Sequence, residues 1–216
     1  MTWKQKLLKL VKPKLDTLDI AHNIDHSLRV FRNCELIVKN YPKADLDVLY
    51  AACLLHDIGQ TINSINEHSH NSILLSENLL KKCNFRDNKI KMTMAIIKSH
   101  DNYFWVKEHE KIKLNLIEEA IFQDADRLES LGAMGIIRQM FWSSRHHLKI
   151  YTPDIPPQKN KIYAGNASPI HTIRDHQLQI YKHFNTPIAK KLAKRKFLFT
   201  KRFLNEFFNE WEFKYV

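Results

Sequence analysis

Apolar residues recur at helical spacing along almost the whole chain. In one stretch, from about residue 24 to residue 40, they fall on one helical face at Ile24, Leu28, Phe31, Leu36 and Ile37. The same spacing predicts a first helix around Trp3–Val11 and further helices over about 45–59, 70–83, 86–99, 114–141 and 171–213. Pro42 stops one helix, Asp45 can cap the next, Gly59 can end it, and Pro187 marks a break in the last region. The pattern therefore predicts an all-α protein.

No repeat, low-complexity tract or dividing linker interrupts this pattern. We therefore expect one domain over residues 1–216, with a helical core over about 20–141 and a C-terminal helical extension over about 170–213. The stretch Tyr151–Pro169 contains four prolines and Gly165, so it is predicted to be a long connection of the kind that often forms a lid or binding loop.

The composition excludes several classes of protein. An apolar content of 44% excludes an intrinsically disordered chain. The four glycines are not spaced to build a dinucleotide-binding turn or a phosphate-binding P-loop, and they are too few for a hairpin-rich all-β fold. Three cysteines, Cys34, Cys53 and Cys83, show no paired spacing, so we expect reduced structural residues in a cytoplasmic protein.

The charge points to an anionic partner. A formal net charge of +11 suits phosphate esters, nucleotides or nucleic acid, although a lysine-rich surface can serve solubility alone. The longest apolar run, Val48–Leu55, is far below the roughly 18 residues that span a bilayer, and the N-terminal residues lack the features of a signal peptide. We expect the first helix to pack on the core; a basic membrane-surface helix is the minor alternative.

Potential metal ligands stand at ends of helices or inside apolar ones. His56 and Asp57 end an apolar helix, where adjacent side chains can converge as the chain turns. His26 lies on an upstream helix, and a downstream apolar helix carries Asp124 and Asp126. Buried carboxylates are costly unless they are paired or bind a metal, so these residues are expected either to form ion pairs or to bind a metal.

Four segments in order carry a resemblance to a known family. They read AHNIDHSLRV, LLHDIG, IIKSHD and QDADRLESLGAMGI, and the C-terminal stretch NTPIAKKLAKRKFLFTKRFLNEFFNEW is similar as well. With these segments the chain, over roughly residues 20–213, resembles the HD-domain superfamily of metal-dependent phosphohydrolases, and most closely a bacterial-type branch of that superfamily. That branch has AHDxxHxxRV, LLHDI, IxxHS and QDADRLEALGAIGI. Asn23 replaces the usual Asp, Gln60 stands where some branches have Lys, and no Glu follows His56-Asp57 closely enough to serve as a general base.

The resemblance implies an HD-type helical bundle with His26, His56, Asp57 and Asp126 as ligands of one divalent ion (Mn, Mg, Ni, Co, Fe or Zn). It also implies catalysis through a water that the ion activates and that Asp57 helps to orient. Asp124 stands about 200° around the helix from Asp126, so we expect it to support the ligands or cap a helix instead.

Other side chains are assigned less directly. His100 is expected to line the pocket as a substrate contact or second-metal ligand, with a helix-capping role as its alternative. Arg29, Lys98 and Arg127 are expected to bind substrate phosphate, unless they are solvated or form structural salt bridges. His68 and His70 are interpreted as surface residues, although some HD branches have a ligand nearby. The remaining residues without a supporting pattern are interpreted as surface or packing residues: His109, His146, His147, His171, His176 and His183.

Two groups near the C-terminus also receive an interpretation. The cations Lys190, Lys191, Lys194, Arg195, Lys196, Lys201 and Arg202 form a solvated helix face, or steer anions if they lie near the pocket. The aromatic residues Phe197, Phe199, Phe203, Phe207, Phe208 and Trp211 form core or a dimer interface.

We therefore expect a hydrolase of a phosphate ester or anhydride, acting on a nucleotide or a similar small anionic metabolite. Three rivals remain open. Some HD relatives are di-iron oxygenases, and His70 and His100 could complete such a ligand set. A non-catalytic HD module that binds nucleotide or nucleic acid, and an HD nuclease, are the other two.

Overall fold

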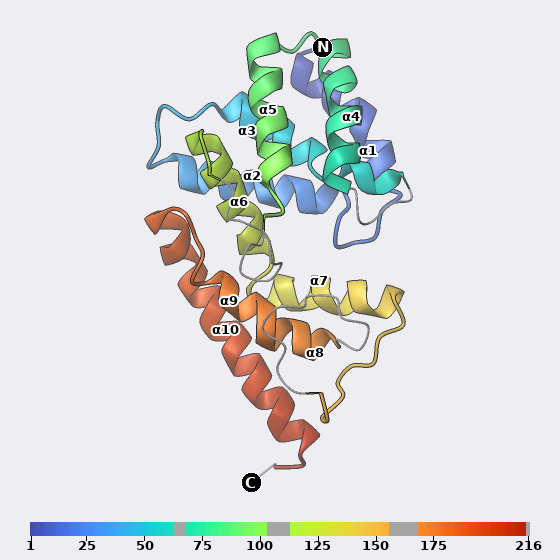
Figure 1. Ribbon diagram of the computed structural model, residues 1–216, viewed down its shortest axis with the longest axis vertical. Coiled ribbons are helices and arrows are strands. Elements are labelled where there is room, and N and C mark those ends of the chain that lie inside the picture. Colours follow the sequence, from blue (N-terminus) through green and yellow to red (C-terminus); the bar gives the residue numbers. More distant parts are fainter. Residues whose placement is uncertain (63–67, 103–112, 156–167, 215–216) are drawn as a thin grey trace. The chain divides into compact units, whose positions relative to one another are not determined.

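The computed structural model describes residues 1–62, 68–102, 113–155 and 168–214, which are helical and contain no strand (Figure 1). This confirms the predicted all-α fold. Contacts group these residues into two compact units, one up to Asp126 and one from Arg127 onward. Each unit is described by itself, and the one-domain arrangement predicted above stays a prediction. His109 and most of the proposed lid segment lie outside the described residues.

The first unit is built around α3 (Leu46–Leu55), a helix that is apolar apart from Asp47 in its first turn and that Asp45 caps as predicted. Around it lie α1 (Trp3–Leu15), α2 (Ile24–Val38), α4 (His68–Lys82) and α5 (Asp87–Ser99), followed in the chain by α6 (Ile117–Glu129). All residues of α3 from Val48 to Leu55 except Tyr50 are buried, as expected of a helix with apolar residues on every face. Figure 1 shows α4 and α5 running side by side, and these two helices pack against each other.

The chain turns sharply after α3. A short 3-10 helix, η1 (Ile58–Thr61), follows His56 and Asp57 and packs against α4. Gly59 permits this packing, because a Cβ atom there would lie 2.1 Å from the His68 carbonyl oxygen and 2.5 Å from the Ser72 amide nitrogen. The Gly59 N–H donates to Ser72 Oγ, and the Ser72 hydroxyl donates to the His56 carbonyl oxygen. Gly59 therefore serves close packing beyond α3, which has already ended at Leu55.

The second unit contains α7 (Gly132–Arg145), the short α8 (Pro169–Thr172), a π-helical turn η3 (Ile173–Gln177), α9 (Leu178–Ile180) and the long α10 (Pro187–Trp211). Its core holds Ile136, Ile170, Ile173 and Leu204, against which Phe203, Phe207 and Phe208 pack. Phe199 and Trp211 are exposed. The predicted break near Pro187 is confirmed, since α10 begins there with Thr186 as its cap.

The single helix predicted over about 114–141 is wrong. The helical conformation ends at Glu129, and α7 starts at Gly132, whose φ of 74° favours glycine. The Gly132 N–H donates to Thr200 Oγ1 of α10, and a Cβ at Gly132 would crowd Lys196 at 3.2 Å. Tertiary contacts with α10 thus hold a break that apolar spacing alone does not reveal.

The three cysteines are unpaired and buried, as predicted. Within the described residues, no helix combines the length and the apolarity needed to cross a bilayer.

Candidate metal centre

Four side chains of the first unit meet where α2, the end of α3 and α6 come together. His26 and His56 point their Nε2 atoms at each other across 3.3 Å. Asp57 Oδ2 lies 3.1 Å from His56 Nε2 and 3.7 Å from His26 Nε2, and Asp126 Oδ1 lies 3.3 Å from His26 Nε2. All four predicted ligands are therefore brought together, and all are buried.

Local structure holds the His26 backbone and orients the His56 imidazole. Asn23 caps α2 by accepting from the backbone N–H groups of Asp25 and His26, a role for which Asn is as good as Asp. His56 Nδ1 lies 3.0 Å from the Cys53 carbonyl oxygen, so Nδ1–H donates there and Nε2 faces the other ligands. The departure from the family pattern at Asn23 thus leaves the His26 backbone held in place.

The electrostatics favour a cation at this point. Burial disfavours the charged form of His56, but the Asp57 carboxylate beside it and that of Asp126 outweigh burial and raise the pKa of His56 to about 9. Burial also opposes ionisation of Asp57, yet His56, His22 and His26 hold its pKa well below the usual range. His26, His56 and Asp57 offer ligand atoms within 4.8 Å of one another, which suits a divalent ion with bonds of about 2.1 Å, and Asp126 adds a carboxylate oxygen 3.3 Å from His26 Nε2.

A second group shares Asp57 with the first. Asp57, His68 and His100 offer ligand atoms within 4.8 Å of one another, as do His26, His56 and Asp57. His68 Nε2 lies 3.3 Å from His100 Nε2. His100 Nδ1 lies 2.6 Å from the Ile97 carbonyl oxygen and donates to it, and burial, reinforced by the charge of His56, lowers the pKa of His100. A neutral imidazole whose Nδ1–H donates to a carbonyl oxygen keeps its Nε2 lone pair for a metal, so a neutral His100 is the form that binds one.

The interpretation of His68 as a surface residue was wrong. It is half-buried against His100, whereas His70 is exposed, so the rival ligand set uses His68 in place of His70. In the sequence, His68, Ser72 and Ser76 stand four positions apart, which places them on one face of a helix. The structure buries the two serines of this face. Ser72 and Gly59 together hold this end of α4 against η1.

The structure also shows what supports the ligands. The Gln60 side-chain amide donates to Asp57 Oδ1, which orients the shared carboxylate. The Phe122 ring packs edge-on against His56 and His100. The Asn33 side-chain amide donates to the Ala125 carbonyl oxygen and so ties α6 to α2 beside Asp126. Sequence reasoning assigned no such role to Gln60, Phe122 or Asn33.

The other predicted site residues are placed as follows. Asp124 is fully buried in α6, and neither group of candidate ligands in the described part of the chain includes it. Arg29 is half-buried on α2, one turn beyond His26, and Lys98 is exposed near the end of α5. Arg127 is 2% exposed, and its guanidinium donates to the His183 carbonyl oxygen in the second unit. Their predicted roles stay predictions.

Among the unassigned histidines, His171 and His176 are buried in the second unit, whereas His147 is exposed. His22 is half-buried and contacts Asp19, with 2.9 Å between Nδ1 and Oδ1. Its ring also lies edge-on to that of His26.

Comparisons with known proteins give a family and a shared fold. The family model of the HD domain matches residues 23–131. A protein of Lactobacillus plantarum of known structure is 26% identical, with a TM-score of 0.82 and 97% of each chain covered. An HD-superfamily hydrolase from Bacillus thuringiensis is 22% identical, with a TM-score of 0.70 and 97% of this chain and 96% of that chain covered.

A further solved structure is that of Bacillus subtilis YpgQ in complex with ADP. It is 20% identical, with a TM-score of 0.71 and 96% of this chain and 94% of that chain covered. No curated protein sequence matches this chain.

Proposed function

Because this chain belongs to the HD domain family, we propose that it is a metal-dependent phosphohydrolase that cleaves a phosphate ester or anhydride of a nucleotide or similar small anionic metabolite. The observation that carries the proposal is the convergence of two imidazole Nε2 atoms and two carboxylates in a buried part of the first unit. A family resemblance alone would give the fold; the intact donor set is what supports catalysis.

His26, His56, Asp57 and Asp126 would hold the divalent ion. When bound, such an ion lowers the pKa of a water molecule and offsets charge on a phosphoryl group. The chain's own contribution is to fix the donors: Cys53 orients His56, Gln60 orients Asp57, and Phe122 packs behind the ring of His56. Burial of these groups strengthens their electrostatic effect on a substrate.

The substrate class follows from charge. The chain carries a formal net charge of +11, which favours anionic ligands. Arg29 stands one turn beyond His26 on α2 and Lys98 stands two residues before His100, so both are proposed to contact substrate phosphate, as is Arg127. The ADP complex of YpgQ, a protein with a similar fold, supports a nucleotide among the candidates.

A second candidate function is favoured by the group of Asp57, His68 and His100. Together with His26, His56 and Asp126 it makes four histidines and two aspartates, which is the ligand set expected of a di-iron oxygenase. Two irons per chain and oxygen consumption would identify this function in place of hydrolysis.

The test is a screen of metals against substrates on the purified full chain. Chelator-treated protein is reloaded separately with Mn, Mg, Ni, Co, Fe or Zn and incubated with nucleoside mono-, di- and triphosphates, with sugar phosphates and with a single-stranded oligonucleotide. Released phosphate is measured and the products are identified by chromatography. We expect phosphate release from at least one nucleotide, with no release from chelated protein.

Asp57→Asn is the informative variant, because it keeps the shape of the side chain and removes the shared charge. We expect it to lower the rate by about a hundredfold or more while leaving helicity unchanged. Asp25→Asn is the matched control: Asp25 is exposed on α2 one residue before His26, and its variant should retain activity. Full activity of Asp57→Asn would remove this centre from the mechanism.

A further inference from the structure

The first three-quarters of α10 carries positive charges and no negative charge. Between Pro187 and Asn205 the helix contains seven lysines and arginines and no acidic residue, although Asp and Glu make up 23 of the 216 residues of the chain. Lys191, Lys194, Arg195, Lys201 and Arg202 are exposed. Within the part of the chain that the structure describes, none of these five forms an ion pair with a carboxylate.

This distribution opposes the electrostatics of the helix itself. The N-terminal end of a helix is electropositive and favours acidic residues, and the C-terminal end favours basic ones. In α10 the first turn has no acidic residue and the last turn has no basic one, while Glu206, Glu210 and Glu212 stand at the C-terminal end. Like charges four positions apart, such as Lys191 and Arg195, further destabilise the helix. A bound anion would relieve both effects.

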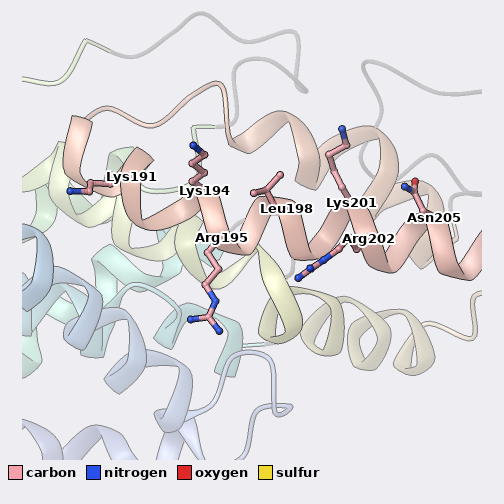
Figure 2. Close-up of a pocket in the computed structure, with 7 residues that line it drawn as sticks. All are labelled: Lys191, Lys194, Arg195, Leu198, Lys201, Arg202 and Asn205. Atoms are coloured by element: carbon pink, nitrogen blue, oxygen red, sulfur yellow. The ribbon is translucent and has the colours of Figure 1, made fainter.

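The exposed cations line one pocket on the helix surface. Its described lining residues are Lys191, Lys194, Arg195, Leu198, Lys201, Arg202 and Asn205. Figure 2 shows Lys194 and Lys201 projecting on one side of α10 and Arg195 and Arg202 on the other, with Leu198 between them. The residues stand three or four positions apart, so the row follows the helix axis for about 21 Å at about 1.5 Å per residue.

The length of the row distinguishes among anionic ligands. One phosphate group or one nucleotide would engage a single turn, whereas this row presents cations on successive turns. A membrane-surface helix would need a broad exposed apolar face, but Phe203, Leu204 and Phe207 of α10 pack into the core of the second unit. Leu198, 48% exposed, is the one apolar side chain among the residues that line the pocket.

We propose that this face of α10 binds the sugar–phosphate backbone of a single-stranded nucleic acid. Proteins that hold such strands independently of sequence combine a positively charged track along the backbone with aromatic side chains that stack on bases, and this face of α10 supplies the charged track. Arg195 and Arg202 supply planar donors for phosphate on one side of Leu198, and Lys194 and Lys201 supply point charges on the other. The surface lies on residues separate from the metal ligands, so the proposal stands independently of the hydrolase assignment.

The experiment uses the full chain without added divalent ions. A fluorescein-labelled oligouridylate of about 16 nucleotides is titrated with protein, and its anisotropy is followed from about 50 to about 200 mM KCl. The test variant changes Lys194, Arg195, Lys201 and Arg202 to Gln. The matched control changes Lys9, Lys39, Lys82 and Lys91 to Gln; these lysines are exposed on the first unit, and both variants lose four charges.

We expect the test variant to bind the oligonucleotide more than about tenfold more weakly than the unaltered chain. The slope of log Kd against log salt should also become shallower by about 2.8, because each of the four lost phosphate contacts contributes about 0.7 for a single strand. The control variant should bind like the unaltered chain. A variant with Lys194→Arg and Lys201→Arg should also retain binding, which separates charge from misfolding.

Two results would overturn the proposal. The first is no binding of the oligonucleotide by the unaltered chain; flotation with phosphatidylserine-containing vesicles that depends on the same four residues would then identify a membrane surface as the ligand. The second is equal weakening of oligonucleotide binding in both quadruple variants.

Discussion

Replacing Gly59 by Ala tests how closely η1 and α4 must pack to bring His68 to the centre. The added Cβ would lie 2.1 Å from the His68 carbonyl oxygen and 2.8 Å from Ser72 Oγ. The first of these is a backbone atom, so α4 itself must move. We expect His68 to shift away from His100, which separates the second group of ligands and leaves His26, His56 and Asp57 together.

The magnitude follows from two contributions. Overpacking against a rigid backbone costs about 1–3 kcal/mol. Loss of the hydrogen bond from the Gly59 N–H to Ser72 Oγ costs about 1 kcal/mol more. The free energy of unfolding of Gly59→Ala should therefore fall by about 2–4 kcal/mol.

Two measurements check this prediction. Urea unfolding of the chelator-treated chain gives the free energy, and equilibrium dialysis with elemental analysis gives the number of ions per chain. The variant should bind fewer ions than the unaltered chain. Gly135→Ala in α7 is the matched control, because its Cβ would lie 2.3 Å from the Ser130 carbonyl carbon; it should also be destabilised, with the ion count unchanged. Unaltered stability of Gly59→Ala, or an equal loss of ions in both variants, would refute the reasoning.

Three further predictions concern the centre. His68→Ala should lower the number of ions bound per chain, while His70→Ala should leave it unchanged; equal effects would contradict the assignment of His68. The pKa of His56 without metal is raised to about 9, so a divalent ion that binds below that pH must displace a proton from His56. The affinity of the chain for the ion should therefore rise by up to about tenfold per pH unit from pH 7 toward about 9. Calorimetry in buffers of different ionisation enthalpy should detect about one proton released per ion bound. A pH-independent affinity would contradict this. Asn23→Ala should destabilise the chain by about 1 kcal/mol in urea unfolding, and Asn23→Asp should not, since both Asn and Asp cap α2; equal losses would exclude the cap.

The sequence could predict the parts of the fold that depend on local chemistry. The cap at Asp45 and the start of α10 at Pro187 follow from residue type and spacing, and the structure confirms both. The break between α6 and α7 does not, because it depends on the contact of Gly132 with Thr200 of α10, 68 positions away. Long-range contacts of this kind leave no periodic signal.

The residues of the candidate site could likewise be predicted only in part from the sequence. The ordered motif was enough to name His26, His56, Asp57 and Asp126, which the structure brings together. Choosing between His68 and His70 required knowing which face of α4 packs against η1. That face is set by Gly59, whose missing side chain appeared in the sequence only as a helix breaker.

The carboxylate of Asp57 belongs to both groups of candidate ligands, and this makes two occupancies thermodynamically interdependent. If ions fill both groups, an ion in one group changes the binding free energy of an ion in the other. This change must be the same whichever of the two ions binds first. A titration would then show cooperativity, positive or negative, whose sign reports whether sharing one anion outweighs repulsion between two neighbouring cations.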